Sequence, residues 1–106
     1  MTVQRIPDNY PTVMPYLLVE RVDDLIAFTT AVFDAKVHSR LTRDDGSVMH
    51  AELQVGAGVI MAGEPVGVFG AIPGSVFVYT EDCDAAYSRA LEAGATPVME
   101  PTDMPH

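Results

Sequence analysis

Two stretches of the chain repeat the same order of apolar and polar positions. Residues 14–37 read MPYLLVERVDDLIAFTTAVFDAKV, and residues 75–98 read SVFVYTEDCDAAYSRALEAGATPV. Each copy runs from an apolar segment of strand length through an acidic turn and an amphipathic helix into another strand. Because a unit of this size cannot bury its apolar face alone, the repeat predicts two modules packed as a pair. Paired modules leave a concave sheet between them, which is a favourable place for a ligand.

The first module, at about residues 12–63, is predicted to have the order β-α-β-β-β. Its helix begins at Asp23 and Asp24, whose carboxylates favour a helix N-terminus. The sequences DDG at 44–46 and GAG at 56–58 are typical of hairpin turns. Between them apolar and polar residues alternate, which predicts a strand with one apolar and one polar face. The four predicted strands cover residues 13–19, 36–42, 48–55 and 59–62.

The second module, at about residues 74–106, contains fewer predicted elements. A strand at 75–79 leads into a helix that starts near Asp82 and ends at Gly94, and a further strand covers 96–99. By comparison with the first module, two strands are missing, which with their turns amount to roughly 20–30 residues. We expect either a truncated chain or another chain to account for this incomplete module.

The connection between the modules, residues 64–74, is rich in Gly and Pro yet apolar for a loop. Its apolar residues are Val66, Val68, Phe69 and Ile72. An apolar connection indicates that it covers a pocket or a partner subunit. Together with the open sheet edges, it predicts a homodimer.

Composition and charge exclude several classes of function. The 106 residues are predicted to form one domain, 1–106, and no stretch approaches the roughly 20 apolar residues of a membrane span. The net charge of −9 repels phosphate backbones, so nucleic-acid binding is not expected. This acidity indicates either solubility or attraction of a cationic small molecule. No signal peptide is predicted at the N-terminus, and the lone Cys83 cannot form an internal disulfide, so a cytoplasmic location is expected.

Four segments, in this order, resemble the vicinal oxygen chelate superfamily, which includes glyoxalase I, bleomycin resistance proteins and extradiol dioxygenases. They are PYLLV, IAFTTAVFDAKV, MHAELQVGAGVIMAGE and DAAYSRALEAGATPV. The resemblance covers residues 12–106 and is greatest to the PhnB-like group. It implies an α+β fold in which paired βαβββ modules form a cupped mixed sheet, and a dimer in many members. It also implies a further hairpin after PTDMPH.

Enzymes of this superfamily hold a divalent metal with His, Glu or Gln side chains that point into the cup. The resemblance implies that three of these positions fall near Met14, Met61 and Ser75, with the fourth beyond residue 106. Thioether and hydroxyl groups are poor ligands for zinc, nickel, manganese or ferrous ions. We therefore predict no metal and no other cofactor.

His50 and Glu52 lie two residues apart on a predicted strand, so their side chains project to one face, with Gln54 next in the row. Three interpretations remain open. The pair contacts a ligand, or it acts chemically as a general acid–base pair or displaced metal pair, or it forms an ion pair on a solvent-facing strand. His38, beside Arg40, is assigned to the surface.

The alternation of the strands also directs aromatic and Met side chains toward the cup. Because Met adapts its shape and aromatic rings stack, this lining suits planar or apolar ligands. The predicted ligand-binding residues are Met14, Tyr16, His50, Glu52, Met61, Ser75, Phe77 and Tyr79.

Three functions follow from these observations. The first is a metal-free protein that binds a small molecule and sequesters a drug or an aromatic or cationic metabolite, as in antibiotic resistance. The alternative is a metal-dependent lyase, isomerase or dioxygenase that uses His50, Glu52 and residues beyond residue 106. The third is an interaction module whose cup is filled by a partner chain.

Overall fold

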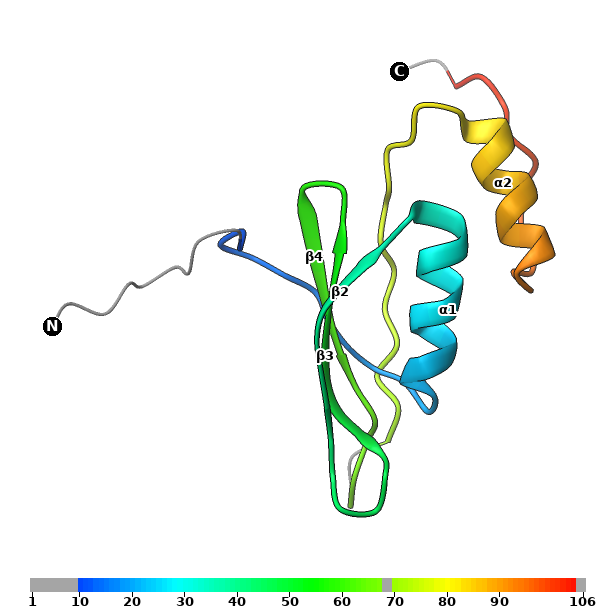
Figure 1. The fold of residues 1–106 in the computed structure, drawn as a ribbon. Helices are drawn as coiled ribbons and strands as arrows, with labels where there is room; N and C mark the ends of the chain where they lie inside the picture. The colour runs from blue at the N-terminus through cyan, green and yellow to red at the C-terminus, as the bar shows by residue number, and fades with distance from the viewer. Residues whose placement is uncertain (1–9, 68–69, 105–106) are drawn as a thin grey trace, which may run out of the picture.

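Helices and strands follow the order predicted for the first module and form a two-layer α+β structure. The computed structural model describes residues 10–67 and 70–104. The elements in chain order are β1 (Tyr16–Leu18), α1 (Val22–Phe33), β2 (Lys36–Thr42), β3 (Val48–Val55), β4 (Gly58–Gly63) and α2 (Cys83–Glu92). The strands form one sheet in the order β1-β4-β3-β2, and both helices lie on the same side of it (Figure 1). The predicted fold class is therefore confirmed.

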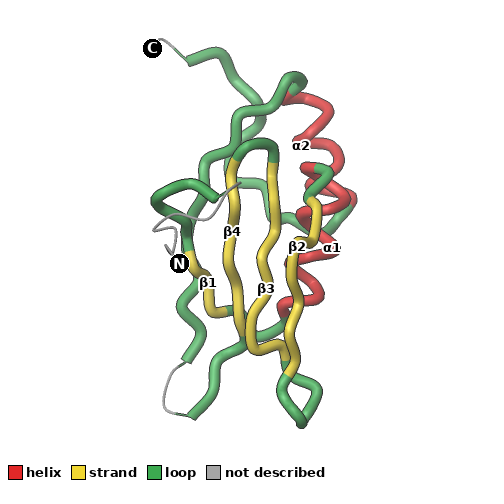
Figure 2. The backbone as a smooth tube through the Cα atoms, turned by 60° about the vertical axis from the view of Figure 1, so that its left-hand side comes forward, coloured by secondary structure: helices red, strands yellow, loops and turns green. Residues whose placement is uncertain are grey.

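The sheet is mixed. β2, β3 and β4 form an antiparallel meander, and β1 joins its edge parallel to β4 (Figure 2). Both predicted hairpin turns are confirmed: Gly46 and Gly56 have φ angles of 88° and 57°, in the left-handed region that favours glycine. In the first turn the Asp45 carboxylate accepts hydrogen bonds from the Ser47 hydroxyl and amide, which hold the pKa of Asp45 below its ordinary value.

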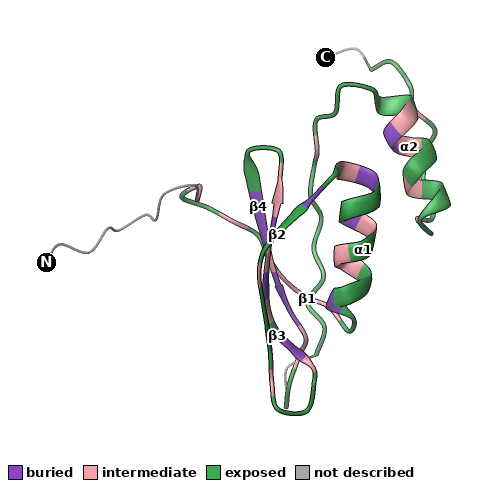
Figure 3. Ribbon diagram, viewed as in Figure 1, coloured by how far each residue is buried: buried purple, intermediate pink, exposed green. Residues whose placement is uncertain are grey.

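The core lies between β3 and α1. Ala51 and Leu53 of β3 are fully buried, and so are Val22 and Val32 of α1, which packs against β3. Figure 3 shows buried segments on both elements. Burial of one such aliphatic side chain stabilises a fold by about 1.5–3 kcal/mol.

The predicted alternation of β3 is confirmed from His50 to Val55, where the polar residues lie on the opposite face of the sheet. It is wrong at the start of the strand, where Val48 is buried and Met49 is exposed, because a register shift opposite Leu41 and Thr42 leaves Met49 without a partner in β2.

The start of α1 differs from the prediction. The N-cap residue is Arg21, which makes no side-chain capping bond, and Asp23 lies inside the first turn. The Asp23 carboxylate is held by two hydrogen bonds from the Arg40 guanidinium on β2, at 2.8 and 2.9 Å, which keep its pKa below its ordinary value. The amide of Val22 is satisfied by the Glu64 carboxylate at 2.9 Å. A side chain distant in sequence therefore replaces a local cap.

The second module contributes a helix and extended chain. α2 begins as predicted, because the Asp82 carboxylate caps it by accepting from the Ala85 amide at 3.0 Å, and Gly94 follows its end with φ of 103°. The strands predicted at 75–79 and 96–99 are wrong, since neither segment has a ladder partner among the described residues. The predicted first strand, 13–19, is shorter and comprises β1 alone.

The connection between the modules touches the edge of the sheet. Ile72 exchanges two backbone hydrogen bonds with Leu18 of β1, at 3.0 and 2.8 Å. Val68, Phe69 and His106 lie outside the described residues. In the described part of the chain, neither helix is long and apolar enough to cross a bilayer.

Candidate functional site

The sheet face opposite the helices carries a row of side chains that the strand register brings together. Glu52 on β3 is paired with Met61 on β4, and Met61 is paired in turn with Tyr16 on β1. His50 lies two residues from Glu52 and therefore on the same face. Neither helix of the described chain covers this face, which we call the open face (Figure 1).

Hydrogen bonds and a charge contact link four residues across the open face. The Tyr10 hydroxyl donates to the Glu52 carboxylate, 2.9 Å from Oε1 and 3.3 Å from Oε2. Glu52 Oε2 lies 3.6 Å from His50 Nε2, an ion pair when the imidazole is protonated. His50 Nδ1 lies 3.2 Å from the Tyr16 hydroxyl, and the imidazole tautomer sets which of them donates. We call Tyr10, Glu52, His50 and Tyr16 the polar chain.

Aromatic rings flank the polar chain. The Tyr16 ring is tilted against the His50 ring at a centroid distance of 5.6 Å, and the Tyr10 ring meets the His38 ring edge-on at 6.5 Å. The side chains of His50 and Glu52 are 24% and 12% exposed, so they are shielded yet reachable. The arrangement offers one carboxylate acceptor between ring surfaces.

The Glu52 carboxylate sets the electrostatics of the polar chain. Its hydrogen bond to Tyr10, followed by desolvation and charge repulsion, raises the pKa of the Tyr10 hydroxyl above its ordinary value. The cations of the neighbouring strand β2, Lys36 and Arg40, are paired with Asp34 and Asp23. The site therefore favours ligands that donate hydrogen bonds or carry positive charge.

The donor set does not fit the metal that the superfamily's enzymes hold. The described residues contain no group of three His, Cys, Asp or Glu side chains close enough to hold a metal ion. On the open face, His50 and Glu52 supply two suitable donors, and the neighbouring Met61 supplies a thioether. Catalytic metal sites typically use three nitrogen, oxygen or thiolate ligands from the protein.

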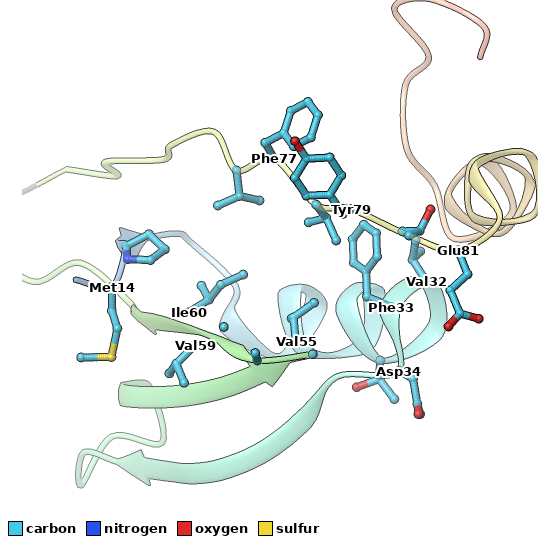
Figure 4. A pocket seen from close by; sticks show the side chains of 18 of the residues that line it. Met14, Val32, Phe33, Asp34, Val55, Val59, Ile60, Phe77, Tyr79 and Glu81 are labelled. Carbon is cyan, nitrogen blue, oxygen red and sulfur yellow. The ribbon is translucent and has the colours of Figure 1, made fainter. Parts of the chain in front are cut away.

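A second concavity lies on the helix side of the sheet. It has a volume of about 1470 Å³ and lies between β4, the last turn of α1 and residues 75–82. Val55, Ile60 and Phe33 point into this hollow (Figure 4). Phe77 and Tyr79 on its far wall are 82% and 91% exposed. Its lining is mainly apolar.

The structure divides the predicted ligand residues between these two places. Tyr16, His50, Glu52 and Met61 lie together on the open face. The other four, Met14, Ser75, Phe77 and Tyr79, line the hollow on the helix side. The prediction of one shared cup assumed that residues 75–79 pair into the sheet, and these residues have no strand partner among the described residues.

Sequence reasoning missed two members of the site. Tyr10 was given no role by the sequence, and His38 was expected on the surface. His38 is indeed exposed, yet its ring contacts Tyr10. Tyr10 lies 42 residues from Glu52, so no periodicity connects the two.

Comparison with known proteins places this geometry in context. The family model described as the Glyoxalase/Bleomycin resistance protein/Dioxygenase superfamily matches residues 11–106. An uncharacterized protein of Mycobacterium bovis is 30% identical over 99 residues, which cover 83% of this chain and 65% of that protein. An uncharacterized protein of Mycobacterium tuberculosis matches equally, over 58% of its length. The chain thus spans less than two thirds of these relatives.

Two solved structures share the fold. TioX from Micromonospora sp. ML1 has a TM-score of 0.64 and 23% identity, over 90% of this chain and 79% of TioX. A PhnB protein from Bacillus cereus has a TM-score of 0.58 and 19% identity, over 74% of this chain and 72% of that protein. At these identities, both likenesses show a shared fold.

Proposed function

The chain belongs to this superfamily, and from that premise we propose that it binds a small aromatic molecule on its open face without a metal ion. The observation that carries the proposal is the polar chain, in which a shielded carboxylate lies between aromatic rings. Rings stack on planar ligands, and a carboxylate accepts strong hydrogen bonds from protonated nitrogen or hydroxyl groups. Both kinds of contact act on one ligand here.

Charge supports a cationic or hydrogen-donating ligand. The net charge of −9 draws cations toward the molecule, and Glu52 is the carboxylate that the open face presents. We propose sequestration of a drug or an aromatic metabolite, a resistance-type role, as the use of such binding. The free thiol of Cys83 is consistent with a location in the cytoplasm, where thiols stay reduced.

A fluorescence titration with proflavine, a planar aromatic cation, tests the proposal. We expect saturable binding that Glu52→Gln weakens about tenfold or more, because a hydrogen bond to a charged group is lost. The matched control is Glu81→Gln at the rim of the hollow, which makes the same change of charge and should leave the affinity unchanged. An unchanged affinity in Glu52→Gln, or equal binding of the anionic dye 8-anilinonaphthalene-1-sulfonate, contradicts it.

The enzyme alternative rests on His50 and Glu52, whose 3.6 Å separation suits an acid–base or metal-binding pair. Elemental analysis of protein purified without chelator or affinity tag separates the two functions. Near-stoichiometric zinc, nickel, manganese or iron that is lost in His50→Ala would favour a metal-dependent lyase, isomerase or dioxygenase over metal-free binding.

A further inference from the structure

Tyr10 belongs to no strand or helix, yet its hydroxyl is bonded to the main acceptor of the open face. We propose that Tyr10 is a built-in occupant of the ligand site, holding at Glu52 the place that a hydroxyl or protonated nitrogen of the ligand takes. Binding then requires the Tyr10 side chain to move away. This inference rests on the proposed function and adds the chemical class of ligand and a competing group.

The contacts of Tyr10 are those expected of a ligand. Its hydroxyl reaches both oxygens of Glu52, at 2.9 and 3.3 Å, and its ring meets His38 edge-on. The other members of the polar chain lie on strands: Glu52 and His50 on β3, and Tyr16 on β1, which is paired with β4. Tyr10 is therefore the one member of the polar chain that regular structure does not hold in place.

The space beside Tyr10 is already open. A shallow hollow of about 370 Å³ is lined by Tyr10, Pro11, Gln54 and Ala57. Gln54 follows Glu52 on the same face of β3, so withdrawal of Tyr10 would extend this hollow toward the Glu52 carboxylate. A planar ring could then lie across β3 with its donor group on Glu52.

The chemical groups of Tyr10 indicate which ligands could take its place at Glu52. Tyr10 presents an aromatic ring and a neutral donor to a carboxylate, and a second carboxylate in that place would be repelled. The ligand class is therefore aromatic hydroxy compounds and aromatic amines or amidines that carry a proton. Aromatic acids are excluded from this place.

Affinity measurements on Tyr10→Phe test the inference. The variant keeps the ring and removes the hydroxyl, so Glu52 becomes free for the ligand. In the native protein, the apparent affinity is reduced in proportion to the fraction of molecules in which Tyr10 has left Glu52. We therefore expect Tyr10→Phe to bind proflavine about five- to tenfold more tightly than the native protein does. The matched control is Tyr16→Phe, which removes the other phenol of the polar chain and should not tighten binding.

A second measurement follows Tyr10 directly. Fluorine NMR of protein containing 3-fluorotyrosine gives a Tyr10 resonance, assigned by its loss in Tyr10→Phe, that should move when proflavine saturates the site. Equal or weaker binding by Tyr10→Phe, or a resonance that stays in place at saturation, overturns the inference while the proposed function stands. Absence of binding in both the native protein and Tyr10→Phe overturns the proposed function and the inference together.

Discussion

At the scale of single residues, Glu64 joins parts of the module that are far apart in sequence. Its carboxylate accepts from the amide of Val22 at 2.9 Å and from the amide of Val48 at 2.8 Å. Its own backbone is bonded to Val48 and to the Arg43 guanidinium. Glu64 thus fixes the first turn of α1 and the start of β3 to the end of β4.

Replacement of Glu64 should therefore destabilise the fold. In Glu64→Ala two backbone donors lose their charged acceptor, and we expect the free energy of unfolding to fall by about 2–4 kcal/mol. Glu64→Gln keeps one oxygen acceptor and should lose about half as much. Urea denaturation measures both variants, with the exposed Glu20→Ala as control. A Glu64→Ala protein within about 0.5 kcal/mol of the native stability would contradict this role.

Alkaline titration tests the state of Tyr10. Because the hydrogen bond to Glu52 raises the pKa of its hydroxyl, this group stays protonated above the pH at which an unfolded Tyr ionises. Its contribution to stability is present below that pH and is lost as the pH rises through the folded-state pKa. Ultraviolet difference spectra should show one late-ionising Tyr that is absent from Tyr10→Phe and ionises earlier in Glu52→Gln. Identical titrations of native and Glu52→Gln proteins would refute the contact.

At the scale of elements, α1 ends at a residue, Asp34, whose backbone conformation is strained and could be relieved by substitution. Asp34 has φ 56° and ψ 41°, a left-handed conformation, and its amide and that of Ala35 close the helix on Thr30 and Thr29. Its carboxylate also lies at the negative end of the helix dipole, where its partner Lys36 is largely exposed.

Asp34→Gly should consequently stabilise the protein by about 0.5 kcal/mol. Removal of Cβ relieves the left-handed strain, and loss of the charge removes an unfavourable dipole interaction, while the greater freedom of unfolded Gly offsets part of the gain. Thermal unfolding should show a rise of about 2–4 °C. Asp34→Ala is the control, because it removes the charge and keeps the strain. Equal melting temperatures for the two variants would contradict the explanation.

Local signals predicted the elements that local interactions form. The period-two pattern of β3 from His50 onward, both glycine turns and the Asp82 cap of α2 involve residues at most a few positions apart, and all were predicted. The cap of α1 was not, because its acceptor is Glu64, 42 residues away in a Gly- and Pro-rich connection. The segment at 75–79 has strand composition, yet a strand also needs a partner.

The same distinction applies to the candidate site. The alternation of β3 was sufficient to place His50 and Glu52 on one face, and the register with β4 and β1 adds Met61 and Tyr16. Tyr10 reaches Glu52 from an irregular segment that carries no periodic signal. The sequence therefore predicts the positions of side chains that lie on a strand, and it misses a side chain, such as Tyr10, that lies in an irregular segment.

At the scale of the whole molecule, apolar side chains remain exposed along the second module. Val76, Phe77, Tyr79, Val98 and Met99 are all exposed, and residues 75–80 form no backbone ladder with the described residues. Large exposed apolar patches with free strand edges favour association. We propose that the protein forms a homodimer that covers residues 75–80, as the apolar connection also indicates.

Hydrogen exchange at several protein concentrations tests this proposal. Within a single copy, amides at 75–80 should exchange rapidly, whereas those of β3 should be protected by ladders on both sides. Association through residues 75–80 should slow exchange of their amides as concentration rises, in parallel with a doubling of mass by light scattering. Rapid exchange there at all concentrations, with monomeric mass, would contradict the homodimer.

The hydrogen bond that the Val22 amide donates to Glu64 also constrains the order in which the first module can fold. During synthesis the start of α1 leaves the ribosome long before residue 64 does, so its first amide lacks this acceptor while β2, β3 and β4 are being made. The closing contact spans 42 residues, and contacts of long sequence separation form late because loop closure opposes them. A nascent chain that ends before Glu64 should therefore carry α1 as a fraying helix, docked firmly on the sheet only when β4 has emerged.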